Sequence, residues 1–214
     1  MARFKESKFE KIGFVSLFLT LISLTITATI NFTPIYRFSI QRYDLVNLSG
    51  LSQEKLLENY RLLLQFLNYP WQTELLLPDF PMSPAGLGHF YDVKQLFLLN
   101  YTVLFLTLIP TGYFLYHLWE KQQLWRLVRP FQWGILVPVI FLFLMLIGFN
   151  TFFVTFHQIF FSNDDWLFNP VTDPIIMVLP EQFFMLCFVF FFLVLEGLFY
   201  GMVLIGKKSI YRSR

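Results

Sequence analysis

The sequence is poor in cysteine and in charged residues. Cys187 is the only thiol in 214 residues, which excludes an internal disulfide and a metal cluster built on cysteines. Charged residues make up 14% of the chain and hydrophobic residues 56%, with phenylalanine at 29 positions. A soluble domain has roughly 25% charged residues. The composition therefore predicts an integral membrane protein, and no part of it indicates binding to nucleic acid.

The sequence also lacks the short motifs of several large enzyme classes. It has no GxSxG segment, no glycine-rich phosphate loop and no HExxH pair. A serine or cysteine nucleophile cannot be argued from any local pattern, and we predict neither a cofactor nor a resident metal. Any chemistry must therefore come from other side chains.

Four apolar segments are long enough to cross a bilayer as helices. They cover about residues 12–32, 93–116, 131–157 and 181–205, and a hydrocarbon core of ~30 Å requires about 20 apolar residues. They predict a single all-α membrane domain, residues 1–214. A polar face follows helical spacing along the first segment and predicts close packing on another helix: Ser16, Thr20, Ser23, Thr27 and Asn31.

The segment 33–92 is richer in polar and aromatic residues and predicts a small α+β lobe between the first two membrane helices. Ile35–Tyr43 has the β-branched and aromatic residues of a strand. Ser52 is placed as the N-cap of a helix that keeps its period to about Asn68. Trp71–Leu77 and Phe80–Ser83 are expected to form a short hairpin or two extended pieces.

The distribution of charge predicts the orientation in the membrane. Eleven of the 16 Lys and Arg residues lie in the N-terminal segment, the turn 117–130 and the C-terminal tail. By the positive-inside rule these parts, including both termini, are cytoplasmic. The lobe and the connection from Phe156 to Phe184 are then extracellular, on the outer side of the cell membrane.

Two of the three histidines are predicted to meet at the outer surface. His89 precedes the second apolar segment and His157 ends the third, so both reach the same side although they are 68 residues apart. Two imidazoles can supply a general base and a general acid near neutral pH. Polar residues close to the pair or to the next membrane entry are predicted to bind or orient a substrate: Asp92, Asn163, Asp164, Asp165, Asp173 and Glu181.

Two other classes of function remain open on the residues alone. The histidine and aspartate side chains could hold a metal in a hydrolase acting on lipid-linked substrates, and chelators would then inhibit the protein. A non-enzymatic membrane scaffold would instead tolerate loss of both histidines, and a transporter accessory would be expected to place ionisable residues at mid-membrane, where this sequence has only Glu196.

The two histidine segments resemble those of a known family. SPAGLGHFYDVK, followed in order by FHQIFF, ND, W, P, D and LPEQFF, is similar to the lipoprotein intramolecular transacylases (Lit) of Gram-positive bacteria, and the likeness covers essentially the whole chain. The resemblance implies a membrane enzyme with four membrane helices, in which His89 and His157 are the catalytic pair. It assigns no role to Ser83.

The resemblance also implies the reaction and the partner. The sn-2 acyl chain of a diacylglyceryl-modified lipoprotein would move to the amine of its own N-terminal cysteine and give a lyso-form lipoprotein. Such an acyl shift needs no enzyme nucleophile, because the substrate amine attacks its own ester. A base for the amine and an acid for the departing glyceryl oxygen suffice, which agrees with the residue inventory. The partners would be lipoproteins and membrane lipid.

Overall fold

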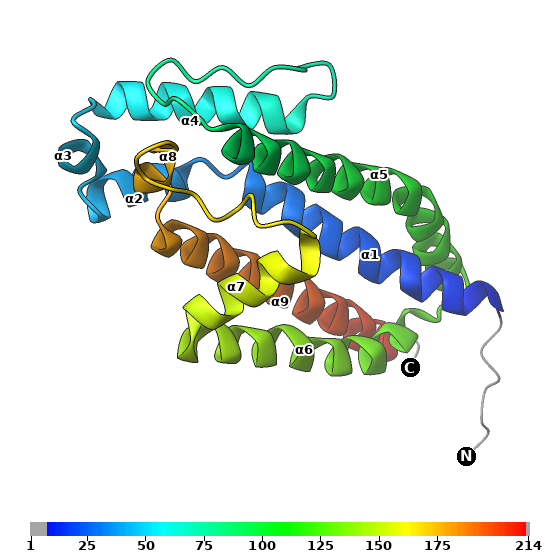
Figure 1. The fold of residues 1–214 in the computed structure, drawn as a ribbon. Helices are drawn as coiled ribbons and strands as arrows, with labels where there is room; N and C mark the ends of the chain where they lie inside the picture. Colours follow the sequence, from blue (N-terminus) through cyan, green and yellow to red (C-terminus); the bar gives the residue numbers. More distant parts are fainter. Residues whose placement is uncertain (1–7, 213–214) are drawn as a thin grey trace. The chain divides into compact units, whose positions relative to one another are not determined.

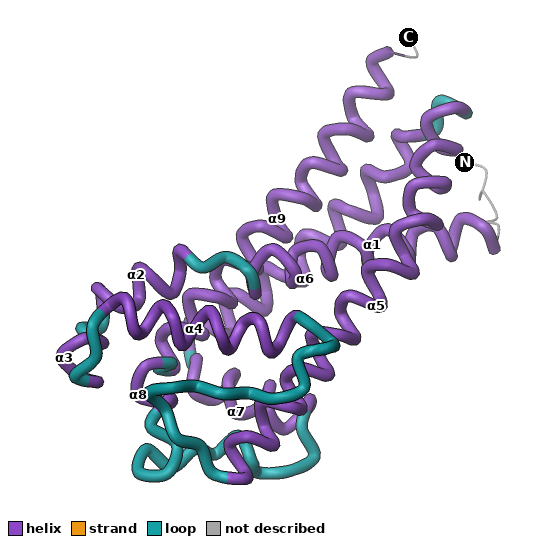
Figure 2. The backbone as a smooth tube through the Cα atoms, turned by 90° about the horizontal axis from the view of Figure 1, so that it is seen from above, coloured by secondary structure: helices purple, strands orange, loops and turns teal. Residues whose placement is uncertain are grey.

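The computed structural model describes residues 8–212, and every regular element among them is helical (Figures 1 and 2). The predicted all-α membrane part is thereby confirmed, but the α+β lobe is wrong because the described residues contain no strand. Arg3, Lys5 and Arg214, which contributed to the charge argument, lie outside the described residues.

Within residues 8–212, four helices are long and apolar enough to cross a membrane: Lys8–Ile30, Pro84–Glu120, Leu124–Ile147 and Glu181–Ile210. They correspond to α1 (Lys8–Ile30), α5 (Pro84–Glu120), the 3₁₀ turn η1 (Leu124–Leu127) with α6 (Val128–Ile147), and α9 (Glu181–Arg212). The second helix thus begins nine residues before the apolar run expected at residue 93.

The predicted continuous helix 131–157 is two helices. α6 ends at Ile147, Gly148 leaves the helical region with ψ 71°, and α7 runs over Phe149–Phe160. Glycine in a helix costs about 1 kcal/mol relative to alanine, so it favours a break. The two pieces also differ in character: α7 exposes the polar residues Asn150 and Thr155, whereas α6 is apolar from Trp133 to its end.

The chain divides into two compact units, and the first contains most of the apolar helices. It comprises residues up to 29, 100–143 and from 190 onward. Thr20 is hydrogen-bonded to Thr107 at 2.9 Å and Thr111 at 2.8 Å, and Asn100 donates to Thr27 at 2.9 Å. These bonds between α1 and α5 confirm that the polar face of the first segment is a packing face.

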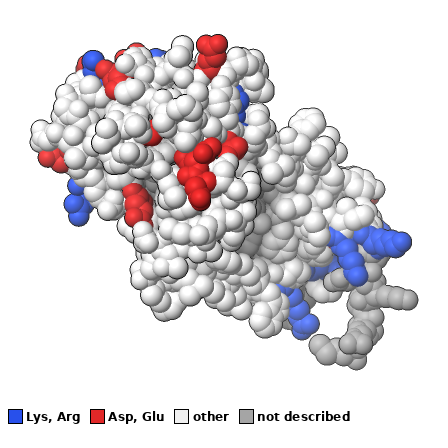
Figure 3. Space-filling model, in the orientation of Figure 1, with Lys and Arg blue, Asp and Glu red and all other residues white. Residues whose placement is uncertain are grey.

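The second unit, residues 30–99 and 144–189, holds both candidate histidines. Its remaining helices are α2 (Pro34–Arg42), α3 (Leu45–Ser49), α4 (Gln53–Asn68) and α8 (Ile175–Val178), and α3 packs on α2 and α8. In the face drawn in Figure 3, acidic side chains gather over this unit, whereas basic side chains are visible over both units.

The strand predicted at Ile35–Tyr43 is helix α2. Pro34 stands in its first turn, where the fixed φ of proline favours a helix start and the missing N–H has no intrahelical partner to lose. The buried residues Tyr36, Ser39 and Ile40 follow helical spacing and not alternation. Tyr36 stacks on Tyr60 of α4 with ring centroids 4.0 Å apart, so packing on α4 selects the helix.

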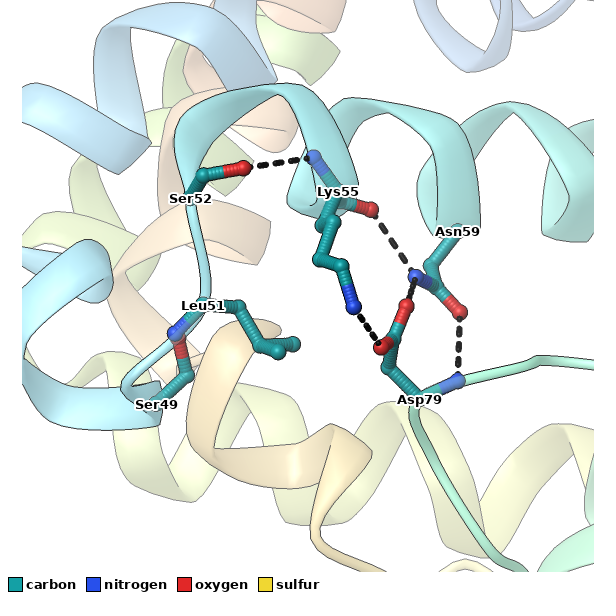
Figure 4. Close-up of polar contacts among 6 residues, drawn as sticks. All are labelled: Ser49, Leu51, Ser52, Lys55, Asn59 and Asp79. Carbon is teal, nitrogen blue, oxygen red and sulfur yellow. Dashed lines mark hydrogen bonds and ion pairs between the residues drawn. The ribbon is translucent and has the colours of Figure 1, made fainter.

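Ser52 caps α4 as predicted, and a polar cluster ties the helix to the segment that follows it (Figure 4). The Ser52 hydroxyl accepts from Lys55 N at 3.3 Å. The Lys55 ammonium binds Asp79 at 2.8 Å, and Asn59 donates to the other Asp79 carboxylate oxygen at 2.8 Å. The first turns of α4 therefore hold the chain near Asp79.

Of the two forms predicted for Trp71–Leu77 and Phe80–Ser83, the structure has extended chain and no hairpin, because no strand pairing is present there. Leu75 and Leu77 are buried while Leu76 is 73% exposed, so the alternation typical of an extended chain is present. Its backbone is bound by side chains of α5 instead: Tyr91 donates to Thr73 O, and the buried Lys94 ammonium donates to the carbonyls of Tyr69 and Gln72. These bonds replace the missing partner strand.

Candidate functional site

His89 and His157 are neighbours in the second unit. His89 lies in the second turn of α5 and His157 in the last turn of α7, and their ring centroids are 5.7 Å apart. Each side chain is 8% exposed. Imidazoles are seldom buried to this extent unless a hydrogen-bond partner or a function requires it. This histidine pair is therefore the centre of the candidate site.

The hydrogen bond of His157 fixes its tautomer. Nδ1 lies 2.7 Å from the carbonyl oxygen of Phe153, one turn earlier on α7. A carbonyl can only accept, so Nδ1 carries the hydrogen and Nε2 of the neutral ring holds the lone pair. Burial lowers the pKa of His157 below its ordinary value, and the bond to Phe153 offsets part of this effect. His157 is therefore a neutral base at neutral pH.

His89 differs from His157 in the hydrogen bonding of its Nδ1. Its Nδ1 is buried and has no hydrogen-bond partner among the described residues. A buried polar atom without a partner costs about 1–3 kcal/mol, which is tolerated at sites where a ligand supplies the missing bond. His89 can thus bind an atom that is not part of the protein.

Aromatic rings enclose both imidazoles. Phe161 directly follows α7 and has its ring 4.7 Å from His89 and 5.5 Å from His157. The loop after it contributes Trp166, 4.7 Å from His157, and Phe168, 5.5 Å from His89. The enclosure removes water from the pair. Sequence reasoning gave these rings no role, since aromatic residues are common throughout this chain and only the fold brings them to the histidines.

Asp173 is buried behind the site and anchors the start of α5. It is 3% exposed, its Oδ1 accepts from Ser83 N at 2.7 Å, and its Oδ2 accepts from the Thr172 hydroxyl at 2.6 Å. Burial alone would raise the pKa of Asp173, but the hydrogen bonds from Thr172 and Ser83 outweigh it and lower the pKa. Asp173 therefore holds the helix that carries His89.

Ser83 is a helix-capping residue to which sequence reasoning gave no role. Its hydroxyl accepts from Gly86 N at 3.0 Å, so it caps α5 with Pro84 as the first helical residue. Serine before proline is a recognisable helix start. Gly86 is needed here because a Cβ at this position would lie 2.2 Å from Asp173 Oδ1.

The remaining predicted site residues are not hydrogen-bonded to either imidazole among the described residues. Asn163 donates to Asp92 at 2.9 Å, an exposed contact between the loop and α5. Asp164 is exposed, and Glu181 is half-buried in the first turn of α9. Asp165 lies against α5, where a Cβ on Gly88 would be 2.9 Å from its Oδ2.

No carboxylate is bonded to either imidazole among the described residues. The same residues contain no group of three or more His, Cys, Asp or Glu side chains that could hold one metal ion. The arrangement therefore differs from a carboxylate–histidine couple and offers two imidazoles facing each other in an aromatic enclosure.

Comparison with known proteins points to one family. A family model described as lipoprotein intramolecular transacylase Lit matches residues 11–184. The solved structure of the membrane integral lipoprotein intramolecular transacylase Lit from Bacillus cereus is 28% identical, with a TM-score of 0.81 over 96% of this chain and 93% of that chain.

Two structures of variants of the same Bacillus cereus protein are equally similar. The variant with a histidine replaced by arginine is 27% identical with a TM-score of 0.83, over 96% of this chain and 93% of that chain. The variant with a histidine replaced by alanine is 26% identical with a TM-score of 0.84, over 96% and 94%. Comparison with the curated proteins finds no match.

Proposed function

We propose, from the premise that this chain belongs to the lipoprotein intramolecular transacylase Lit family, that it moves an acyl chain within a lipoprotein from the glyceryl ester to the N-terminal amine. The chain is a membrane protein: it has four helices able to cross a bilayer, and its solved relatives are membrane integral. The donor is the sn-2 ester of a diacylglyceryl-modified lipoprotein, and the product is the lyso form.

The reaction requires proton transfer and positioning but no protein nucleophile. The substrate nitrogen forms a bond to the ester carbonyl carbon, the bond from that carbon to the glyceryl oxygen breaks, and one amine proton ends on that oxygen. Attack within one molecule gains from proximity once the amine and ester are held together. The protein must therefore remove one proton and deliver one proton.

His157 is the base in this proposal. Its Nδ1 hydrogen is committed to Phe153 O, so Nε2 is the atom that takes the amine proton. Burial keeps the pKa of His157 low, and the imidazole is unprotonated where the amine, with a pKa of about 7.7–8.0, becomes neutral. Both reactants are thus in the correct form slightly above neutral pH.

His89 is the proton donor to the glyceryl oxygen, and the proton that His157 took from the amine then passes to His89, so that both imidazoles return to their starting form. It faces His157 at 5.7 Å between ring centroids, and its unpartnered Nδ1 is available to the substrate. Asp173 and Ser83 hold the first turn of α5 and so fix its position. Asp92 and Asn163 tie the covering loop to the same helix and orient it.

The aromatic enclosure favours acyl transfer over hydrolysis. Phe161, Trp166 and Phe168 surround the imidazoles and exclude water, which would otherwise compete with the amine for the ester. The observation that carries the proposal is this buried, facing histidine pair with one tautomer fixed. The charge distribution supports a site on the outer face of the cell membrane with both termini cytoplasmic.

The test uses mass spectrometry of lipoprotein N-termini from cells that express each variant. His89→Ala and His157→Ala should each abolish most lyso-form product, and the double variant should be little worse because groups acting as a unit are not additive. His117→Ala is the matched control, because this third histidine lies in the first unit, where its ring contacts Phe9 and Tyr113. Full activity without either candidate histidine would overturn the proposal.

A further inference from the structure

Trp166 has a contact with His157 that enclosure alone does not require. Its ring centroid is 4.7 Å from the imidazole centroid and the two planes are 30° apart, so the faces of the rings meet. On α7 the ring of Phe153 lies 4.2 Å from the same imidazole. His157 is therefore in ring contact with both an indole and a phenyl ring.

The imidazolium form of His157 has no anionic partner. Of the titratable groups on the elements around it, His89 is in ring contact and would repel a positive charge when itself protonated. The carboxylates on α5, the loop and α9 are bonded elsewhere or lie outside hydrogen-bond contact with the imidazole: Asp92, Asp164, Asp165, Asp173 and Glu181. A proton on His157 must be stabilised by something other than a charge.

We propose that Trp166 is a positioning residue that stabilises the imidazolium formed when His157 takes the substrate's amine proton. Indole has the strongest cation–π attraction among the aromatic side chains, and the attraction grows when water is excluded. This inference rests on the proposed function, because it assigns His157 as the base. The indole strengthens the base without adding a carboxylate that would keep it protonated in the resting state.

The size of the expected shift in the pKa of His157 follows from the ordinary energy range of cation–π contacts. Removing the attraction should lower the pKa of His157 by about 0.4–1.5 pH units, equivalent to about 0.5–2 kcal/mol at 1.36 kcal/mol per unit. Simple removal of the ring, as in Trp166→Leu, also admits water, which acts in the opposite direction and could unfold the loop. A substitution that keeps the shape of the indole is therefore the decisive one.

The experiment places fluorinated tryptophans at position 166 alone in the full chain, since fluorine weakens the ring's negative face with little change in volume. The pKa of His157 is read by NMR of labelled histidine in micelles, in a His117→Asn background that removes one signal. We expect the pKa to fall stepwise with each added fluorine. The same analogues at Trp133, which is 72% exposed, should leave it unchanged.

An unchanged or rising pKa of His157 across the fluorine series would overturn the inference. The result is independent of activity, so it is distinct from failure of the proposed function, which would appear as lyso-form product made by His157→Ala. As a second readout, the acid break of the pH–rate profile should move to lower pH by the same shift.

Discussion

Gly86→Ala should destabilise the protein, although alanine is the better helix former. The new Cβ would lie 2.2 Å from Asp173 Oδ1 and 3.0 Å from Asp173 Cγ. Carbon–oxygen contacts are normally about 3.3 Å or more, so the carboxylate must retreat by roughly 1 Å. That movement breaks its 2.7 Å hydrogen bond to Ser83 N.

The size of the effect follows from two opposing contributions. Loss of a hydrogen bond to a charged group costs about 1.5–3 kcal/mol, and the gain in helix propensity offsets about 1 kcal/mol. We expect the free energy of unfolding to fall by about 0.5–2 kcal/mol. Activity should fall as well, because the affected turn carries His89 three residues later.

The assay is equilibrium unfolding of the purified protein in micelles, with Gly112→Ala as control. Gly112 lies on the same helix with no atom within 4 Å of its built Cβ, so this substitution should be neutral or stabilising. In an Asp173→Ala background, Gly86→Ala should lose most of its cost, since the obstructing carboxylate is absent. Equal stability of Gly86→Ala and Gly112→Ala would refute the argument.

Three further predictions concern the reaction and its setting. Below about pH 8 the logarithm of the acyl-transfer rate should fall with slope 1 against pH, because the substrate amine becomes protonated. The slope should become steeper only below about pH 6.5, because burial lowers the pKa of His157. A steeper slope already above pH 7 would contradict this prediction. In a Cys187→Ala background, cysteines at the exposed Leu76 and Val171 should label with an impermeant reagent in intact cells, and cysteine at Gln122 should not; the reverse pattern would place the site in the cytoplasm. Mixed lipoproteins with light and heavy acyl chains should give no scrambled amides, and heavy chains on light lipoprotein would refute transfer within one molecule.

Local features of the sequence were sufficient to predict the membrane helices, the cap at Ser52 and the packing face of α1. Long apolar runs identify membrane-crossing helices because the bilayer penalises any other backbone arrangement. Ser52 was identified as a cap because its hydroxyl satisfies an amide three residues away. The threonines of α1 were identified as a packing face by their spacing alone, which reflects helical geometry.

Tertiary contacts decided the elements where local preference is weak. Ile35–Tyr43 has strand composition, but burial of Tyr36 and Ile40 against α4 makes it a helix. Trp71–Leu77 is extended, as one of its two predicted forms requires, yet Lys94 and Tyr91 take the place of a paired strand. No property of these segments alone specifies which partner covers them.

The identity of the two histidines could be proposed from the sequence, because membrane topology and family resemblance both bring them to one surface. Their 5.7 Å separation, the fixed tautomer of His157 and the indole of Trp166 could not be proposed in this way. These features depend on contacts between α5, α7 and the following loop, which are distant in sequence. Side-chain geometry across such contacts is set by packing, and packing exists only in the folded chain.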